Sequence, residues 1–531
     1  MAERRRRLLW LVPADSRFID VLLSFLLAVG IATLLASGLK DFGLHWDEGV
    51  YFRAGSSYLS WLRHPSLKSI DRVWSENHEH PPAHKIVAAF TTWLFHDVLK
   101  ITDRITGYRV SSLAFAAVTV WSLYWLTLSL FGRAEALLAS LMLFLIPRVF
   151  YEGHLLTLDL SAMALWTCLA AVVWQGWKQQ AESPIRLGLF TALALLTKIN
   201  APFALVCRYL LSLKRYWLSE GPSVSGTVIC VREMRFAFVL FVTSLVLFVV
   251  GWPWLWSSPF QRIIAFTEFH SHHWLAPVAY LGTTYSSPPW HYPYVMFFFT
   301  TPAILFVLAC VGLLLLLRQW RDDRAFFVLI NAFIPMLLVQ MSQAKYNGVR
   351  LFLPSFPFVA ILAAVAVVTT CRVISARRVS RGLLCASSAA LILYLANETR
   401  RYYPYTDSYF SAWIGGIKGA DRNTSEVQYW CNSSLGLLKW MEGHKGERWW
   451  ANTCGPMFIE YFMYGQIGWR PRIEASADRA DYWVVFNTAG HGEANRQKLR
   501  TIKPEMSIDV EGVELVGVYD RQRVVAGGPG P

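Results

Sequence analysis

Long apolar runs separated by short polar segments dominate the chain up to about residue 400. The first run, Phe18 to Leu39, is too long for the apolar core of a signal peptide and lacks a clear cleavage site, so it predicts an uncleaved first span. A full membrane crossing takes about 20 predominantly apolar residues. Further apolar runs follow at 107–131, 134–147, 156–177, 185–197, 201–213, 236–256, 293–317, 325–341, 351–371 and 383–397. Together they predict about eleven membrane-spanning helices, although the shorter runs within 134–177 and 185–213 could be divided differently.

Two segments between the first and second runs show helical amphipathic spacing. Glu48 to Leu62 and Ala83 to Leu99 each place Tyr, Trp and Phe side chains on one face. This pattern predicts two helices that lie in the outer membrane interface. The segment 257–292 is rich in aromatic residues and histidine, and we expect it on the same surface.

The pattern changes from about residue 420, where short alternating segments replace the apolar runs. The predicted strands are Trp449 to Asn452, Tyr482 to Phe486 and Glu514 to Tyr519. The predicted helices are Leu435 to Glu442, Pro456 to Tyr464 and Glu493 to Ile502. Mixed elements of this length predict a small α/β domain. It contains no G-x-G-x-x-G fingerprint, so nothing in it implies a bound nucleotide.

The expected fold class is therefore an α-helical polytopic membrane protein with a small C-terminal extracytoplasmic α/β domain. We divide the chain into a basic N-terminal segment, a transmembrane region that contains the long external loop, an interfacial connector and the α/β domain. These parts are residues 1–17, 18–397 with the loop 40–106, 398–425 and 426–531.

Composition and charge agree with a membrane protein. Hydrophobic residues make up 54% of the chain and charged residues 16%, with a mean hydropathy of +0.34, whereas soluble domains carry about 25% charged residues. The net charge of +14 could indicate nucleic-acid binding, but Arg and Lys gather in short segments between apolar runs, as the positive-inside rule expects. We therefore expect no nucleic-acid partner. We expect a plasma (inner) membrane protein with a cytoplasmic N-terminus, and with 40–106, 257–292 and the tail from 398 outside.

The cysteines form neither a C-x-x-C pair nor a zinc-binding pattern. Four of them lie in apolar runs and are interpreted as core residues: Cys168, Cys207, Cys310 and Cys385. Cys431 and Cys454 lie in the soluble tail, where they could pair as a disulfide if the tail is extracytoplasmic.

Two adjacent acids, Asp47 and Glu48, follow the first span and begin an amphipathic helix. One interpretation is helix capping, with Asp47 as the N-cap and Glu48 in the first turn. The other is a functional site, because acids are costly at the membrane boundary and tend to be retained there for function.

The same loop contains several histidines close to acids. His78, His80 and His84, with Glu76 and Glu79, could bind a divalent metal ion. Their spacing matches no defined zinc motif, so they are weak metal candidates. The pair Pro81-Pro82 more simply begins the second interface helix.

Asp159 lies about one turn into an apolar run, where an acid should face a polar cavity or a cationic partner rather than lipid. The simpler alternative is a structural salt bridge from Asp159 to Arg148 or Arg109.

Lys345 and Arg350 are basic residues on the outer side, against the positive-inside trend. They could extend to lipid headgroups at the interface. They could also recognise a lipid-linked phosphate, for which arginine offers a fork of donors.

These elements, in this order and on one face, resemble the membrane glycosyltransferases of the GT-C fold. The likeness is to the protein O-mannosyltransferase-like group (glycosyltransferase family 39), which includes bacterial relatives that modify lipid A. It covers roughly residues 15–425. The motifs that carry it are Asp47-Glu48, His80-Pro81-Pro82, Asp159, Arg350-Leu351-Phe352-Leu353-Pro354 and the stretch Ser408 to Ala420. In that stretch, Ile417 and Ser411 replace the Pro and Asn that are usual in bacterial members.

The resemblance implies a sugar donor on a polyprenyl phosphate and inverting transfer to an acceptor hydroxyl of a glycan, lipid or protein. Asp47 matches the family's position for the general base, with Glu48 as its neighbour or substitute. Asp159 would orient the acceptor or a cationic partner. The residues implied to bind substrate or phosphate are Lys85, His80, Lys345, Arg350 and Tyr346. A divalent metal is left open, and no nucleotide is needed.

Two other classes compete with this interpretation. One is a transporter or flippase of lipid-linked glycans, but such proteins place ionisable groups near the membrane midplane and often show repeated halves. The acids here cluster at one boundary, and the chain has no visible repeat. The other is a non-catalytic envelope scaffold, which would leave the Asp47-Glu48 loop without a role.

Overall fold

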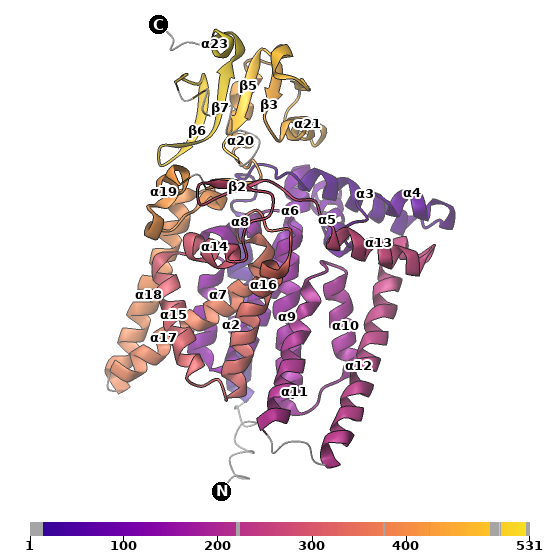
Figure 1. The fold of residues 1–531 in the computed structure, drawn as a ribbon, viewed down its shortest axis with the longest axis vertical. Helices are drawn as coiled ribbons and strands as arrows, with labels where there is room; N and C mark the ends of the chain where they lie inside the picture. Colours follow the sequence, from indigo (N-terminus) through magenta and orange to yellow (C-terminus); the bar gives the residue numbers. More distant parts are fainter. Residues whose placement is uncertain are drawn as a thin grey trace.

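The computed structural model describes residues 14–218, 224–374, 377–423, 425–488, 499 and 501–526. Long helices run side by side in one layer, and a smaller domain that contains a β-sheet lies at one end of them (Figure 1). We call this end of the helical layer the domain side. The basic N-terminal segment predicted at 1–17 lies almost entirely outside the described residues.

Each of the eleven apolar runs forms a helix. The long helices are α2 (Ala14–Ala36), α6 (Arg104–Leu130), α7 (Arg133–Leu143), α9 (Leu158–Gln179), α10 (Pro184–Leu195), α11 (Val206–Leu218), α12 (Val224–Gly251), α15 (Ala303–Leu317), α16 (Asp323–Met341), α17 (Phe356–Ile374) and α18 (Arg377–Tyr402). The protein is therefore a helical multi-pass membrane protein, as predicted.

The number of complete spans is lower than the predicted eleven when length and apolar composition alone are considered. Among the described residues, seven helices are long and apolar enough to cross a membrane, and α7 with α8 (Pro147–His154), bent by 68° at the break between them, would make eight. Proline explains several of the breaks because it cannot continue a helix from the preceding residue. Pro147 begins α8, and Pro302 separates α15 from the preceding helix, α14 (Tyr292–Thr300).

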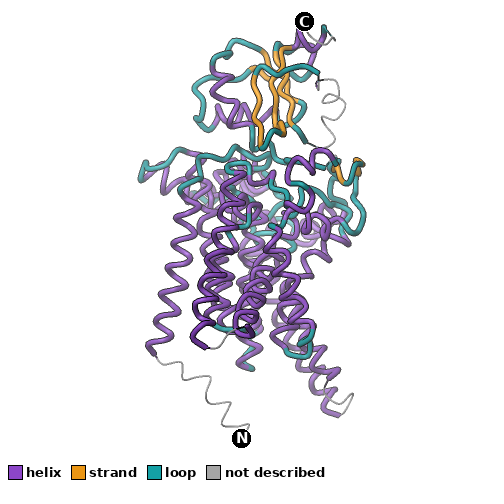
Figure 2. Tube along the Cα trace, turned by 90° about the vertical axis from the view of Figure 1, so that its left-hand side faces the viewer, coloured by secondary structure: helices purple, strands orange, loops and turns teal. Residues whose placement is uncertain are grey.

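Short helices lie across the domain side, as both views show (Figures 1 and 2). They include α3 (Glu48–Arg63), α4 (Ile70–Trp74), α5 (Ala83–Thr92) with the π-helical turn η2 (Trp93–Val98), and α13 (Pro259–Ser271). The two amphipathic helices expected in the loop 40–106 are thus α3 and α5 with η2. Helix α3 buries one aromatic face, which includes Tyr51, Phe52 and Tyr58, as its spacing predicts.

Short helical turns and a hairpin complete the helical region. The turns are η1 (Leu67–Ser69), η3 (Ala201–Leu205), η4 (Pro253–Trp256), η5 (Arg350–Ser355), η6 (Thr406–Ser408) and η7 (Ala412–Ile414), followed by α19 (Gly416–Arg422). The antiparallel hairpin consists of β1 (Val278–Tyr280) and β2 (Thr283–Tyr285).

The C-terminal domain has a five-stranded mixed sheet with the order β4-β3-β5-β7-β6. Strand β3 pairs in parallel with β4 and β5, whereas β7 pairs antiparallel with β5 and β6. The elements are α20 (Ser434–Glu442), β3 (Arg448–Ala451), α21 (Gly455–Met463), β4 (Arg472–Ile473), η8 (Ala477–Arg479), β5 (Tyr482–Phe486), β6 (Met506–Val510), β7 (Val513–Asp520) and α23 (Arg521–Val525). Strands β4 and β6 were not predicted, and the predicted helix at 493–502 lies largely outside the described residues.

The C-terminal domain packs on the segment that precedes α3. The Asn432 side chain accepts a hydrogen bond from the Gly43 backbone at 2.7 Å, and the Tyr461 hydroxyl accepts one from the Leu44 backbone at 2.7 Å. One buried apolar cluster continues from Leu44 and Phe52 into α20 and α21. The domain and the start of α3 therefore share a core.

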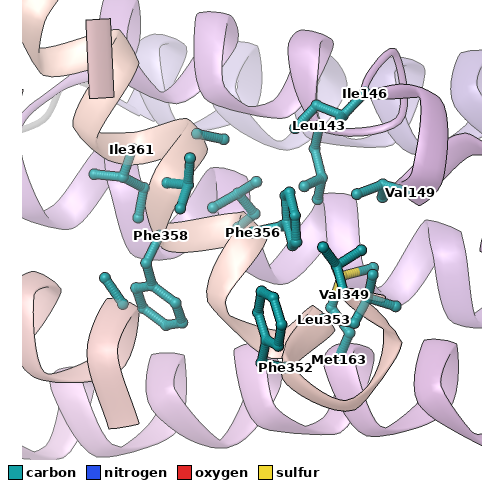
Figure 3. Close-up of a cluster of buried hydrophobic side chains, with 14 of the residues drawn as sticks. Leu143, Ile146, Val149, Met163, Val349, Phe352, Leu353, Phe356, Phe358 and Ile361 are labelled. Atoms are coloured by element: carbon teal, nitrogen blue, oxygen red, sulfur yellow. The ribbon is translucent and has the colours of Figure 1, made fainter. Parts of the chain in front are cut away.

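A second apolar cluster anchors the segment that contains Arg350. The apolar side chains on both sides of Arg350 in the sequence belong to a buried cluster between helices (Figure 3). Those labelled there include Val349, Phe352, Leu353 and Phe356, which pack with Leu143, Ile146, Val149 and Met163. Burial of these apolar side chains fixes the backbone from which Arg350 projects.

Candidate active site

A cavity of about 890 Å³ lies on the domain side and is lined by residues of both the helical region and the C-terminal domain. The segment before α3, the start of α9 and the turn after α10 contribute to its wall. Its wall also includes the loop after α13, the turn before η5, the segment 426–430 and the loop 452–454. The cavity therefore joins parts of the chain that are far apart in sequence.

Four charged side chains meet in this cavity. One Arg350 nitrogen, Nη1, lies 3.7 Å from Oδ2 of Asp47 and 4.0 Å from Oδ2 of Asp159. The Lys198 ammonium group forms an ion pair with the other oxygen of Asp159. Two carboxylates and two cations thus alternate along one wall, and their formal charges cancel.

The ends of helices place two of these groups. Asp159 lies in the first turn of α9, where Thr157 caps the helix by accepting a hydrogen bond from the Leu160 backbone. Lys198 follows the C-terminal end of α10. A carboxylate near a helix N-terminus and a cation near a helix C-terminus are both favoured by the helix dipole. Asp159 therefore pairs with Lys198 and Arg350, rather than with the alternative partners Arg148 or Arg109.

Asp47 occupies the N-cap position of α3, but its side chain makes no capping hydrogen bond. Its backbone N–H instead donates to Nδ1 of His45 at 3.0 Å. The carboxylate lines the cavity, and 30% of the side chain is exposed. The capping alternative therefore does not account for the orientation of this carboxylate.

Glu48, the neighbouring acid, is fully buried and does not line the cavity. Arg109 donates two hydrogen bonds to it, from Nε at 2.8 Å and from Nη2 at 2.6 Å, and the Leu156 backbone donates a third at 3.0 Å. Burial alone would raise the pKa of Glu48, but the charge and hydrogen bonds of Arg109 outweigh burial and lower the pKa. Glu48 ties three segments together, so its predicted catalytic role is not one that we propose.

Arg350 is largely enclosed by aromatic rings. Its guanidinium carbon lies 4.5 Å from the centre of the Trp430 ring and 5.2 Å from that of Tyr346. Planar guanidinium groups stack on aromatic faces and still present their N–H donors at the edge. Nε of Arg350 is buried without a hydrogen-bond partner among the described residues. The group is therefore held in place with donor capacity to spare.

Comparison with known proteins bears on the family and the fold of the chain. Residues 79–254 match the family model of dolichyl-phosphate-mannose-protein mannosyltransferases. The crystal structure of ArnT from Cupriavidus metallidurans in the apo state superposes over 95% of this chain and 99% of its own, with a TM-score of 0.52 at 13% identity. The oligosaccharyltransferase AglB from Archaeoglobus fulgidus superposes over 89% of this chain and 70% of its own, with a TM-score of 0.50 at 10% identity. No curated protein matches the chain by sequence.

The chain has the GT-C fold that these membrane glycosyltransferases share.

Several of the candidate residues come together in the cavity. The sequence-predicted residues that line it are Asp47, His80, Asp159, Tyr346 and Arg350. The Tyr346 hydroxyl lies 3.4 Å from Nδ1 of His273. Burial, together with the charges of Lys85 and Lys198, holds the pKa of His80 well below its usual range. His80 is therefore neutral at neutral pH and contributes a hydrogen-bonding ring rather than a charge.

Lys85 lies outside the cavity lining and has a structural environment. Its ammonium group donates to the Asn77 backbone at 2.8 Å, to the Asn77 side chain at 2.9 Å and to the His80 backbone at 2.8 Å. All three of its donors are used in holding the turn before α5. We therefore do not propose Lys85 as a phosphate ligand.

Lys345 is also absent from the cavity lining, although its neighbour Tyr346 is part of it. Its ammonium group donates to the Ser342 backbone and lies 3.4 Å from the Ser287 hydroxyl. These contacts hold the turn that leads to Arg350. Lys345 therefore supports the site from behind rather than facing the cavity.

The three weak metal candidates are separated in this fold. Nδ1 of His78 donates a hydrogen bond to the Ser75 backbone carbonyl at 2.8 Å, and Nε2 of His84 pairs with the Ser111 hydroxyl at 3.2 Å. Burial lowers the pKa of His84 to about 3. Within the ranges that the structure describes, no group of three or more His, Cys, Asp or Glu side chains is placed to hold a metal ion.

Two important residues of the cavity were missed by sequence reasoning. Lys198 was hidden because the boundaries of the apolar runs at 185–213 were ambiguous, which left its side of the membrane undetermined. A basic residue on the same side as Asp47 and Asp159 was the available signal. Trp430 had no such signal, because its position over Arg350 depends on how the segment after residue 425 folds onto the helical region.

The connector motif Ser408 to Ala420 lies behind the cavity. The Tyr409 backbone carbonyl accepts a hydrogen bond from Nε of Arg148 at 3.3 Å. Gly415 and Gly416 both have positive φ, at +83° and +64°, and form the turn into α19. Such conformations favour glycine, which explains the Gly-Gly pair in this stretch.

Proposed function

We propose that the protein is a glycosyltransferase that moves a sugar from a polyprenyl-phosphate donor to an acceptor hydroxyl. The transfer inverts the anomeric carbon and takes place on the extracytoplasmic face of the plasma membrane. The observation that carries the proposal is the position of Asp47. Its partly exposed carboxylate lies in the same cavity as two cations, Arg350 and Lys198, whose side chains are 11% and 13% exposed. This arrangement supplies a base for one substrate and positive charge for the other.

The proposed step is a single displacement at the anomeric carbon. The acceptor oxygen forms a bond to that carbon while its proton passes to the Asp47 carboxylate. The bond between the anomeric carbon and the phosphate oxygen breaks, and the polyprenyl phosphate leaves with the electron pair. A hydroxyl is a weak nucleophile until a positioned base accepts its proton. The charge that develops on the phosphate is stabilised by cations that are already in place before the reaction.

Arg350 and Lys198 are the proposed phosphate ligands, and Asp159 holds both through its two oxygens. Tyr346 supports the guanidinium of Arg350, and His80 supplies a neutral ring to the wall. The name of the matched family includes a dolichyl-phosphate-linked sugar, and the AglB structure contains a dolichol-phosphate. Both facts support a lipid-linked donor here.

Charge distribution supports the proposed orientation. Basic residues such as Arg133, Lys178, Lys214 and Arg318 lie at ends of the long helices away from the domain side. By the positive-inside rule that end is cytoplasmic. Cys431 and Cys454 form a disulfide on the domain side, which suits an oxidising compartment outside the cytoplasm.

A transfer assay with purified protein tests the proposal. The donors are a panel of short polyprenyl-phosphate sugars, and the acceptors are total membrane lipid and envelope extract. Replacing Asp47 by Asn keeps the size of the side chain and removes the base. We expect Asp47→Asn to lower transfer by about a hundredfold or more, with unchanged membrane insertion and thermal unfolding.

Asp97→Asn is the matched control, because the Asp97 side chain is 58% exposed and lies outside the cavity. It should transfer sugar like the wild type. Transfer by Asp47→Asn at the wild-type rate would refute the base assignment. If folded wild-type protein consumes no donor across the panel but moves a labelled lipid-linked glycan between leaflets, the flippase alternative replaces the transferase.

A further inference from the structure

Trp430 contacts both Arg350, the proposed phosphate ligand, and His45, which lies next to the proposed base. Its ring lies 4.5 Å from the guanidinium carbon of Arg350 and stacks on the His45 ring at 4.4 Å. His45 in turn accepts the backbone N–H of Asp47. One buried indole therefore borders the proposed phosphate ligand and the residue that orients the proposed base.

A covalent link follows Trp430 directly. Cys431 forms a disulfide with Cys454, which is the last residue before α21 of the C-terminal domain. Cys454, with Asn452 and Thr453, also lines the cavity. The disulfide thus joins the segment that carries Trp430 to a loop that forms another part of the cavity lining.

The backbone at both cysteines is in a conformation that side chains rarely adopt. Cys431 has φ +56° and Cys454 has φ +58°. Such left-handed positions in residues other than glycine cost free energy and persist where the surroundings hold them. Both cysteines are almost fully buried in the core that the domain shares with the start of α3. The link and the core together impose these two turns.

We propose that the Cys431–Cys454 disulfide is a positioning element of the active site. It holds Trp430 against Arg350 and His45, and so sets the distance between the Arg350 guanidinium and the Asp47 carboxylate, which is the proposed base. The inference rests on the proposed function for its kinetic consequence. Its structural consequence, the ordering of the segments around His45 and Arg350, stands apart from any activity.

Kinetics of four proteins test the positioning role. They are the wild type, the variant with Cys431→Ser and Cys454→Ser, Trp430→Ala, and the variant with all three changes. Removing the disulfide should lower kcat/KM for the donor by about tenfold or more, because small displacements of catalytic groups are costly. The triple variant should be no slower than Trp430→Ala, since both changes remove one and the same constraint. Trp430→Phe should recover much of the activity, and Cys385→Ser, which changes an exposed cysteine of α18, should have none of these effects.

Losses that multiply in the triple variant would overturn the proposal, as would wild-type kcat/KM in the folded protein without the disulfide. Hydrogen–deuterium exchange supplies a readout without turnover. Peptides that contain residues 45–48 and 346–350 should exchange faster without the disulfide, and unchanged exchange there would refute the positioning role. If the wild type transfers no sugar, the proposed function fails, and the exchange measurement still decides the positioning role.

Discussion

At the scale of single residues, Arg350 has two kinds of neighbour. It lies near carboxylates and also packs against aromatic rings, so it has more than one proposed role. In the resting site, two carboxylates balance Arg350 and Lys198. When Asp47 accepts the acceptor's proton, one negative charge disappears from this group. The positive charge thereby released can offset the charge that grows on the leaving phosphate. The proposed reaction therefore couples proton transfer to leaving-group stabilisation through one guanidinium.

Replacing Arg350 by Lys tests this coupling. Lysine keeps the charge but loses the planar stacking on Trp430 and the fork of donors, so we expect kcat/KM for the donor to fall by about tenfold or more. Arg350→Gln, which also removes the charge, should be slower still. Arg63→Lys is the control, because Arg63 stacks on Trp93 at 4.4 Å away from the cavity. Equal activity of Arg350→Lys and the wild type would show that stacking has no role.

Glu48 differs from its neighbour Asp47 in that it contributes to stability. Removing its charge leaves Arg109 buried without its partner, which costs about 3–5 kcal/mol. We expect Glu48→Gln to lower the thermal unfolding temperature strongly, whereas Glu442→Gln, at a 61% exposed position, should not.

The pKa of Glu48 gives this stability a pH dependence. Its folded-state pKa lies below the ordinary value of 4.5, so the stabilisation is present above that value and is lost as the pH falls through the folded-state pKa. Unfolding measured from neutral to acid pH should show this loss in the wild type. The acid sensitivity should be smaller in Glu48→Gln, and equal acid sensitivity in both would contradict the assignment.

At the scale of elements, the turn before η5 determines where Arg350 points. Asn347 and Gly348 both have positive φ, and the Gly348 backbone donates a hydrogen bond to the Tyr292 hydroxyl at 2.9 Å. A Cβ at position 348 would lie 2.3 Å from Nη1 of the buried Arg148. The turn can therefore keep its shape only with glycine at this position.

Gly348→Ala should accordingly damage both stability and activity. We expect a loss of about 1–3 kcal/mol from backbone strain, a further loss from displacing Arg148, and slower transfer because Arg350 moves. Gly30→Ala in α2 is the control, since a Cβ there meets nothing within 4 Å. Unfolding temperature and donor kcat/KM of the two variants are the measurements, and a wild-type result for Gly348→Ala would show that the turn is not constrained.

The elements also show what a sequence can predict here. The apolar runs predicted every long helix. The positions of Asp47, Asp159 and Arg350 on the outer side of the membrane predicted that they belong to one site. The same reasoning could not tell Asp47 from Glu48, because the burial of Glu48 depends on Arg109, 61 positions away. It selected Lys85 because of its position, although local carbonyl groups occupy its donors. It overlooked Lys198 because the helices around it are short, so the sequence did not show where a membrane span ends and a loop begins.

At the scale of the whole molecule, the site lies between the helical layer and the C-terminal domain, so its function depends on which side of the membrane this boundary faces. A reporter that is active only outside the cytoplasm, fused at the C-terminal end, should be active. The same reporter fused after Leu218, at the end of α11, should be silent. A silent reporter at the C-terminal end, together with an active one after Leu218, would invert the proposed orientation and contradict a donor presented from the outer leaflet.

The shared core between the start of α3 and the C-terminal domain limits how such enzymes can be recombined. Gly43 and Asn432, which are hydrogen-bonded, lie 389 positions apart, and a chimera with a relative's C-terminal domain would separate them. An exchange of that domain alone should yield a folded helical region with an open, misaligned cavity. Transfer of the C-terminal domain between relatives therefore requires moving the first loop together with the tail, because the two parts share one buried core.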